Sequence, residues 1–222
     1  MAEVHKRKRR ANREIRRALS ARTAREAIGA ITPGCEIFGV TKGQFSLIDI
    51  IEHVVGATGP VDVVLSTWTA AAADLGFAMG LISDGRIRSL RFVVDFSFPR
   101  RQPEYCAALR ERFGDDAVRL TKSHAKFVVL RNEAWNVVIR SSMNLNENKR
   151  LESFEVSDDP GMATYLVELC QTLFDDHAPG AQFDQSPGQN VREFNSWFGD
   201  DVHSRDIRRA GWTQQKTGKT IQ

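Results

Sequence analysis

The chain has 222 residues, of which 41% are hydrophobic and 27% charged, and its formal net charge is +3. These values suit one folded domain with appendages, and no apolar run reaches the roughly 18 residues that a membrane helix needs. The three cysteines are far apart and lack C-x-x-C spacing. That spacing argues against a disulfide framework or a zinc site and favours a reducing, cytoplasmic setting.

The first 30 residues are strongly basic and contain few apolar side chains. Residues 1–25 hold ten Lys and Arg against Glu3 and Glu14 alone. We expect a loosely helical or disordered arm over residues 1–30. Nucleic acid is its expected partner, with a solvated basic tail as the alternative, and a membrane surface fits less well because apolar side chains are scarce. The expected contacts are Lys6, Arg7, Lys8, Arg9, Arg10, Arg13, Arg16 and Arg17.

Beyond the arm, Pro and Gly punctuate short extended pieces, and Ser46 is placed to cap a helix that runs to about residue 55. From residue 61 strands and helices alternate. We expect strands over 61–68, 89–96, 117–130, 136–144 and 151–156, and helices over 71–85, 103–114 and 162–176. This order predicts an α/β domain over residues 31–180, with helices on both faces of the sheet, and a polar C-terminal tail over 181–222.

Two of the expected strands, 117–130 and 136–144, read as a hairpin with polar residues at its open end. Pairing across a turn over residues 131–135 places Lys126 opposite Arg140 and His124 opposite Ser142. Because side chains alternate between the faces of a strand, four polar residues then share one face. They are His124, Lys126, Ser142 and Asn144. A slip of one residue in the register would scatter them.

Such a cluster suits the binding of a tetrahedral oxyanion. Lysine supplies a cation, and serine and asparagine supply hydrogen-bond donors to the non-bridging oxygens. Histidine can act as nucleophile or as general acid and base. Glu155, on the next expected strand, would accept the second ring N–H of His124 and fix its tautomer. A histidine taken alone is more often structural, so this interpretation depends on the whole set converging.

The pattern resembles the phospholipase D superfamily, whose signature is H-x-K-x4-D-x6-G-S-x-N followed by a glutamate on the next strand. It is most similar to the short, single-motif branch typified by bacterial metal-independent endonucleases, and the resemblance spans residues 45–177. Two positions depart from the signature, because Arg131 stands where the family has Asp and Ser141 where it has Gly. The matching residues are His124, Lys126, Ser142, Asn144 and Glu155.

The resemblance implies a phospholipase D-like mixed sheet and a phosphodiesterase that acts on DNA, with RNA left open. A single H-x-K motif implies a homodimer with one composite site. One His124 would attack phosphorus to form a phosphohistidine, and the His124 of the other subunit would protonate the leaving oxygen and later activate water. The family needs no metal or cofactor. The alternative is a DNA-binding protein with a degenerate site, which the departures at Arg131 and Ser141 favour.

Overall fold

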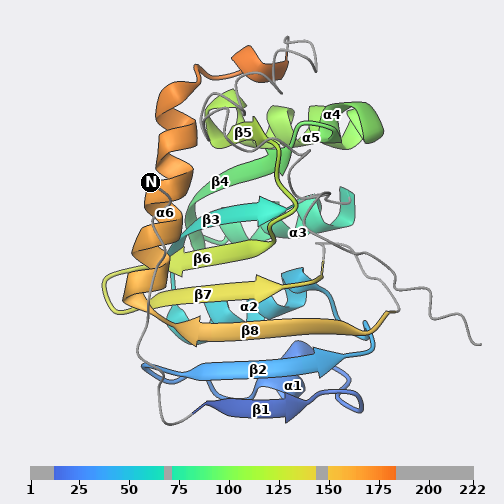
Figure 1. Ribbon diagram of the computed structural model, residues 1–222, viewed down its shortest axis with the longest axis vertical. Helices are drawn as coiled ribbons and strands as arrows, with labels where there is room; N and C mark the ends of the chain where they lie inside the picture. The colour runs from blue at the N-terminus through green and yellow to red at the C-terminus, as the bar shows by residue number, and fades with distance from the viewer. Residues whose placement is uncertain (1–12, 68–71, 144–149, 184–222) are drawn as a thin grey trace, which may run out of the picture.

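The computed structural model describes residues 13–67, 72–143 and 150–183. In this part of the chain, eight strands form one mixed sheet in the order β1-β2-β8-β7-β6-β3-β4-β5 (Figure 1). The strands are β1 (Glu14–Arg17), β2 (Glu36–Thr41), β3 (Val61–Thr67), β4 (Ile87–Asp95), β5 (Val118–Thr121), β6 (Phe127–Arg131), β7 (Asn136–Ser141) and β8 (Glu152–Asp158). The helices are α1 (Ala24–Ile28), α2 (Leu47–Thr58), α3 (Ala72–Ser83), α4 (Phe98–Arg101), α5 (Pro103–Phe113) and α6 (Pro160–Asp176), with short 3₁₀ turns η1 (Asp115–Ala117) and η2 (Ala181–Phe183).

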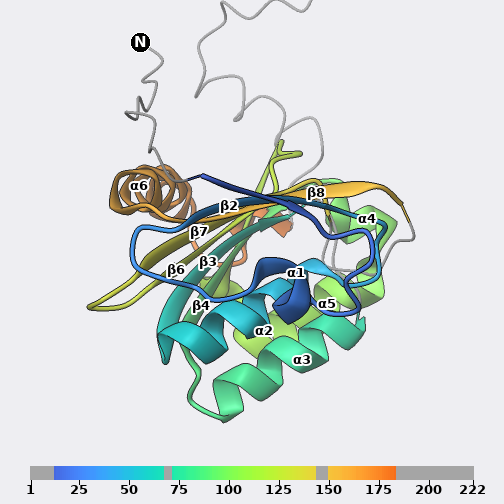
Figure 2. The same cartoon turned by 90° about the horizontal axis from the view of Figure 1, so that it is seen from below.

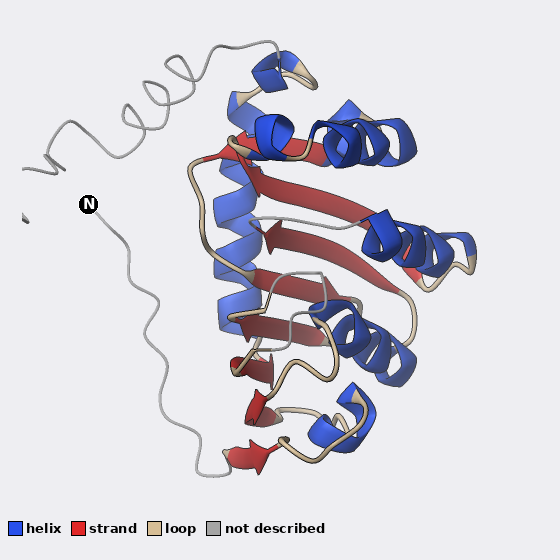
Figure 3. Ribbon diagram, turned by 90° about the vertical axis from the view of Figure 1, so that its right-hand side faces the viewer, coloured by secondary structure: helices blue, strands red, loops and turns tan. Residues whose placement is uncertain are grey.

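Helices cover both faces of the sheet, as the sequence predicts. Helix α6 lies on one face, and α1, α2, α3 and α5 lie on the other (Figures 2 and 3). Successive side chains of β6 point to opposite faces of the sheet. Leu130 belongs to the large core cluster that includes α2, whereas Val129 packs with Ala163 and Leu166 of α6. Central strands with two buried faces explain the continuous apolar runs of the sequence.

The helix boundaries follow the capping residues. Ser46 caps α2, and its backbone N–H and hydroxyl both donate to Asp49, at 2.6 Å and 2.9 Å. Pro103 opens α5, where a missing N–H costs nothing. Gly114 ends that helix with a φ of 79°, a conformation that favours glycine. These three boundaries agree with the sequence analysis.

The second half of the expected basic arm is more ordered than predicted. Glu14–Arg17 form strand β1, which pairs in parallel with β2 at the edge of the sheet, where a loose helix or disordered chain was expected. Arg13 secures its start through ion pairs with Glu36 at 2.8 Å and Glu155 at 3.0 Å. The basic residues at positions 6–10 lie outside the described residues.

The single strand expected over 117–130 is in fact two strands. Strand β5 pairs with β4 at one edge of the sheet, whereas β6 pairs with β3 and β7. Because β3 and β4 separate β5 from β6, the chain must cross over between them. His124 and Lys126 therefore lie in the crossover segment and not within a strand.

Candidate functional site

The register of the β6–β7 hairpin differs by one residue from the expected one. Phe127, and not Lys126, faces Arg140, and Arg131 pairs with Asn136. The turn explains the difference, because the side-chain oxygen of Asn132 accepts from the N–H groups of Ala134 at 3.0 Å and Trp135 at 2.9 Å. This side chain closes a turn one residue shorter than assumed.

Part of the expected cluster nevertheless converges. The Nζ atom of Lys126 lies 3.3 Å from Nδ1 of His124. Lys126 and Ser142 line one pocket of about 560 Å³ between the sheet and α6. The slip in register does not separate these residues, because His124 and Lys126 lie outside the strand and do not follow its alternation. Asn144 lies outside the described residues.

Burial lowers the pKa of Lys126, and the nearby carboxylate of Glu152 partly offsets this effect. A lysine that has lost part of its hydration binds an incoming anion with a smaller further desolvation cost. Lys126 is thus a partly desolvated cation on the wall of the pocket.

Glu152 is a site residue that the sequence analysis missed. The Ser142 hydroxyl donates to the Glu152 carboxylate, and it accepts from the N–H of Ser153 at 3.0 Å. The contact arises because Ser141 pairs with Phe154, so the chain beyond β7 runs beside the first residue of β8. The available signal was the first glutamate of the "LESFEV" segment, which does not match the family signature.

Glu155 lies in the same pocket, but its recorded partners are two guanidiniums. One carboxylate oxygen accepts from Arg140 and the other from Arg13. Only 13% of the Glu155 side chain is exposed, whereas the two arginine side chains are 49% and 39% exposed. Its role as the partner of the His124 ring remains a prediction.

The two departures from the signature have distinct structural roles. The Nε atom of Arg131 donates to the Asn136 side chain at 3.0 Å, at the end of β6 remote from Lys126. The Ser141 hydroxyl donates to the carbonyl of Ser153 and accepts from the N–H of Met143, both at 2.9 Å. Ser141 therefore supports the segment that carries Ser142, and Arg131 stabilises the turn.

The described arginines of the basic arm divide between the two faces of the sheet. Arg13 reaches Glu155 on the face of α6. Arg16 pairs with Glu14 and lies near Gly29, on the face of α1. Arg17 is the last residue of β1.

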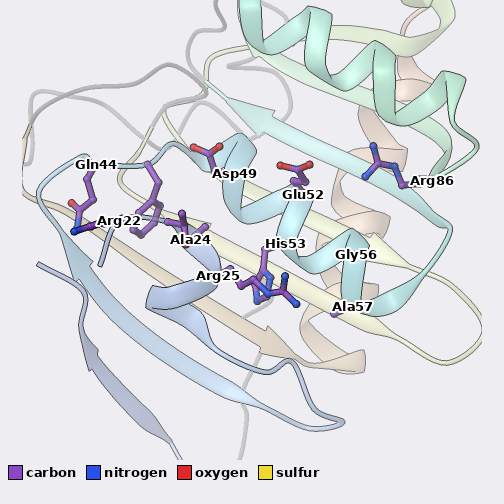
Figure 4. Close-up of a pocket in the computed structure, with 12 residues that line it drawn as sticks. Arg22, Ala24, Arg25, Gln44, Asp49, Glu52, His53, Gly56, Ala57 and Arg86 are labelled. Carbon is purple, nitrogen blue, oxygen red and sulfur yellow. The ribbon is translucent and has the colours of Figure 1, made fainter. Parts of the chain in front are cut away.

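A second pocket, of about 580 Å³, lies between α1 and α2 on the face opposite α6 (Figure 4). Within residues 13–67, 72–143 and 150–183, no group of three or more His, Cys, Asp or Glu side chains is placed to hold a metal ion. None of the described helices is both long enough and apolar enough to span a bilayer.

Comparison with known proteins gives structural similarities only. No protein-family model and no curated protein matches the chain. Nuc from Salmonella typhimurium, described as a phospholipase D family member, is 15% identical with a TM-score of 0.45, over 63% of this chain and 93% of its own. NucT from Helicobacter pylori is 11% identical with a TM-score of 0.45, over 63% and 96%. Polyphosphate kinase from Porphyromonas gingivalis is 13% identical with a TM-score of 0.47, over 65% and 27%. With TM-scores this low, activity must be inferred from the residues of the chain itself.

Proposed function

We propose that the chain is a phospholipase D-like phosphodiesterase that cleaves nucleic acid. The observation that carries this proposal is the contact between Lys126 and His124 at 3.3 Å, with Lys126 and Ser142 lining the same pocket. A cation that contacts an imidazole and shares a pocket with a hydroxyl suits the binding and cleavage of a phosphodiester. DNA is the proposed substrate, with RNA as the other source of the same linkage.

The contact also indicates which nitrogen of His124 holds a proton. A lysine ammonium can only donate, so Nδ1 accepts, and the neutral ring carries its hydrogen on Nε2. Protonation of a leaving oxygen instead requires the imidazolium form, which carries a hydrogen on both ring nitrogens. Attack through Nε2 requires the other tautomer, and a bound phosphate favours it by drawing Lys126 from the ring to a phosphate oxygen.

The proposed reaction uses two copies of the chain, because each contributes a single His124. Nε2 of one His124 forms a bond to phosphorus while the bond from phosphorus to the ester oxygen breaks. His124 of the second copy, as the imidazolium, gives a proton to that oxygen, and its neutral ring then takes a proton from the water that hydrolyses the phosphohistidine. Metal independence and the homodimer come from the family resemblance, and the basic arm would supply affinity that falls with salt.

The test is cleavage of plasmid and single-stranded DNA in EDTA by the full-length protein. The wild type should cut, and His124→Ala should lose essentially all activity because it removes both nucleophile and acid. His177→Ala is the matched control, since His177 caps the end of α6 through the Leu173 carbonyl. Cleavage that survives in His124→Ala, or that needs a divalent ion, would contradict the proposal.

A second candidate function is a DNA-binding protein that does not cut. The observation favouring it is the engagement of Glu155 by Arg13 and Arg140, which occupies the carboxylate that the family places beside the histidine. In that case wild type and His124→Ala would be equally inert and would shift DNA equally well in a gel.

A further inference from the structure

The pocket between α1 and α2 shares no lining residue with the pocket at Lys126. Figure 4 shows Arg25 and His53 together on the side of α1, and the carboxylates of Asp49 and Glu52 directed to the other side of α2. Its volume of about 580 Å³ is in the range that small ligands occupy. The pocket thus has a cationic side and an acidic side.

Hydrogen bonds hold the walls of this pocket in place. The Gln44 side chain donates to the carbonyl of Ala21 at 2.9 Å and also to that of Ala18, which fixes the loop before α1. Nε2 of His53 lies 2.7 Å from the carbonyl of Gly29, and because a carbonyl only accepts, Nε2 donates and joins α2 to the end of α1. The pocket is therefore formed before any ligand arrives.

The cationic side contains two guanidiniums without a protein partner. Arg22 and Arg25 are exposed, and neither guanidinium has a recorded hydrogen bond or ion pair within the part of the chain that the structure describes. Arg86, on the far side, is already paired with Asp84 at 2.8 Å. Both arginines line the pocket, and guanidiniums suit a phosphate group, which accepts several hydrogen bonds at once.

A ligand that binds the cationic side and also contacts the acidic side needs hydrogen-bond donors. Asp49 is used by Ser46 at the start of α2, but the Glu52 carboxylate has no recorded partner among the described residues. A ligand that fits both sides carries a phosphate and a group with N–H donors. We propose that this pocket binds a nucleotide unit, with its phosphate at Arg22 and Arg25 and an amino-bearing base at Glu52.

Titration calorimetry with the full chain tests this site with adenosine 5′-monophosphate, adenosine and ribose 5-phosphate as probes. The monophosphate should bind and adenosine should not. The double variant Arg22→Gln/Arg25→Gln should bind the monophosphate about 100-fold more weakly, because two charge-assisted hydrogen bonds are lost. Glu52→Gln should weaken the monophosphate but not ribose 5-phosphate, which has no base.

The control is Arg100→Gln/Arg112→Gln, which removes the same charge from exposed positions on α4 and α5 and should change affinity by less than about twofold. Equal losses in the two double variants, or no binding of the monophosphate, would overturn the assignment. If a 5′-phosphorylated oligodeoxyadenylate binds more tightly than the monophosphate, the ligand is the end of a strand. If the two bind with equal affinity, the ligand is a free nucleotide.

This site does not depend on the proposed phosphodiesterase. His124→Ala should bind the monophosphate as the wild type does, even where it abolishes cleavage. If the protein cuts DNA but does not bind the monophosphate, only the second site is refuted. If it binds the monophosphate but does not cut DNA, only the proposed reaction is refuted.

Discussion

At the scale of single residues, the unexpected member of the site is Glu152. It accepts from Ser142 and raises the pKa of Lys126 against the larger lowering effect of burial. Glu155, three residues later on the same strand, instead forms ion pairs with Arg13 and Arg140. We therefore expect neutralisation of Glu152 and of Glu155 to have different effects on the cleavage rate and on stability.

We expect Glu152→Gln to slow DNA cleavage roughly 10-fold, because the hydrogen bond that orients Ser142 loses its charge assistance. Glu155→Gln should cost about 1 kcal/mol of unfolding free energy, since its two ion pairs involve partly exposed arginines. Initial cleavage rates and urea unfolding measure the two effects. If Glu155→Gln slows cleavage more than Glu152→Gln without loss of stability, then Glu155 acts on His124 as the family resemblance implies.

At the scale of elements, the contact between β2 and β8 depends on a missing side chain. Gly39 of β2 pairs with Phe154 of β8, and the phenyl ring occupies the space that a Cβ at Gly39 would fill. Phe154 is fully buried and contacts Phe45 edge to face at 6.0 Å between ring centroids. The buried ring would have to shift to admit a Cβ, so this pairing favours glycine.

Gly39→Ala should lower the free energy of unfolding by roughly 1–3 kcal/mol, because the added methyl group overpacks the core. Gly80→Ala is its counterpart, since Gly80 lies within α3 with nothing near its Cβ position. That substitution should raise stability by about 0.5–1 kcal/mol by removing the entropic cost of a helical glycine. Urea denaturation compares the two variants, and a destabilised Gly80→Ala would contradict the assigned helix.

At the scale of the whole molecule, the two-sided core sequesters all three cysteines. Burial raises the pKa of Cys106 to about 11 and that of Cys170 to about 12, and Cys35 is also buried. Cys170 packs with Val93 on the face of α6, and Cys106 lies in the larger cluster on the opposite face. Thiol reactivity therefore reports on both halves of the core.

A thiol reagent at pH 8 should leave these cysteines unlabelled in the native protein and label them once urea unfolds it. Because the folded pKa values lie above the ordinary value of 9.0, the folded state keeps protons that the unfolded state releases. Stability should therefore fall as the pH rises from about 9 to about 12. Fast labelling of native protein at pH 8 would show that one layer opens readily.

The sequence by itself determined the α/β class, the helices on both faces and the cap at Ser46, and it predicted His124, Lys126 and Ser142 as site residues. These follow from local periodicity, capping chemistry and spacing, all of which lie within short stretches of chain. Only the tertiary structure decided the ordering of β1, the register of the hairpin and the different contacts of Glu152 and Glu155. Each depends on contacts between segments far apart or on one turn side chain, such as Asn132, and no short stretch of sequence encodes such contacts.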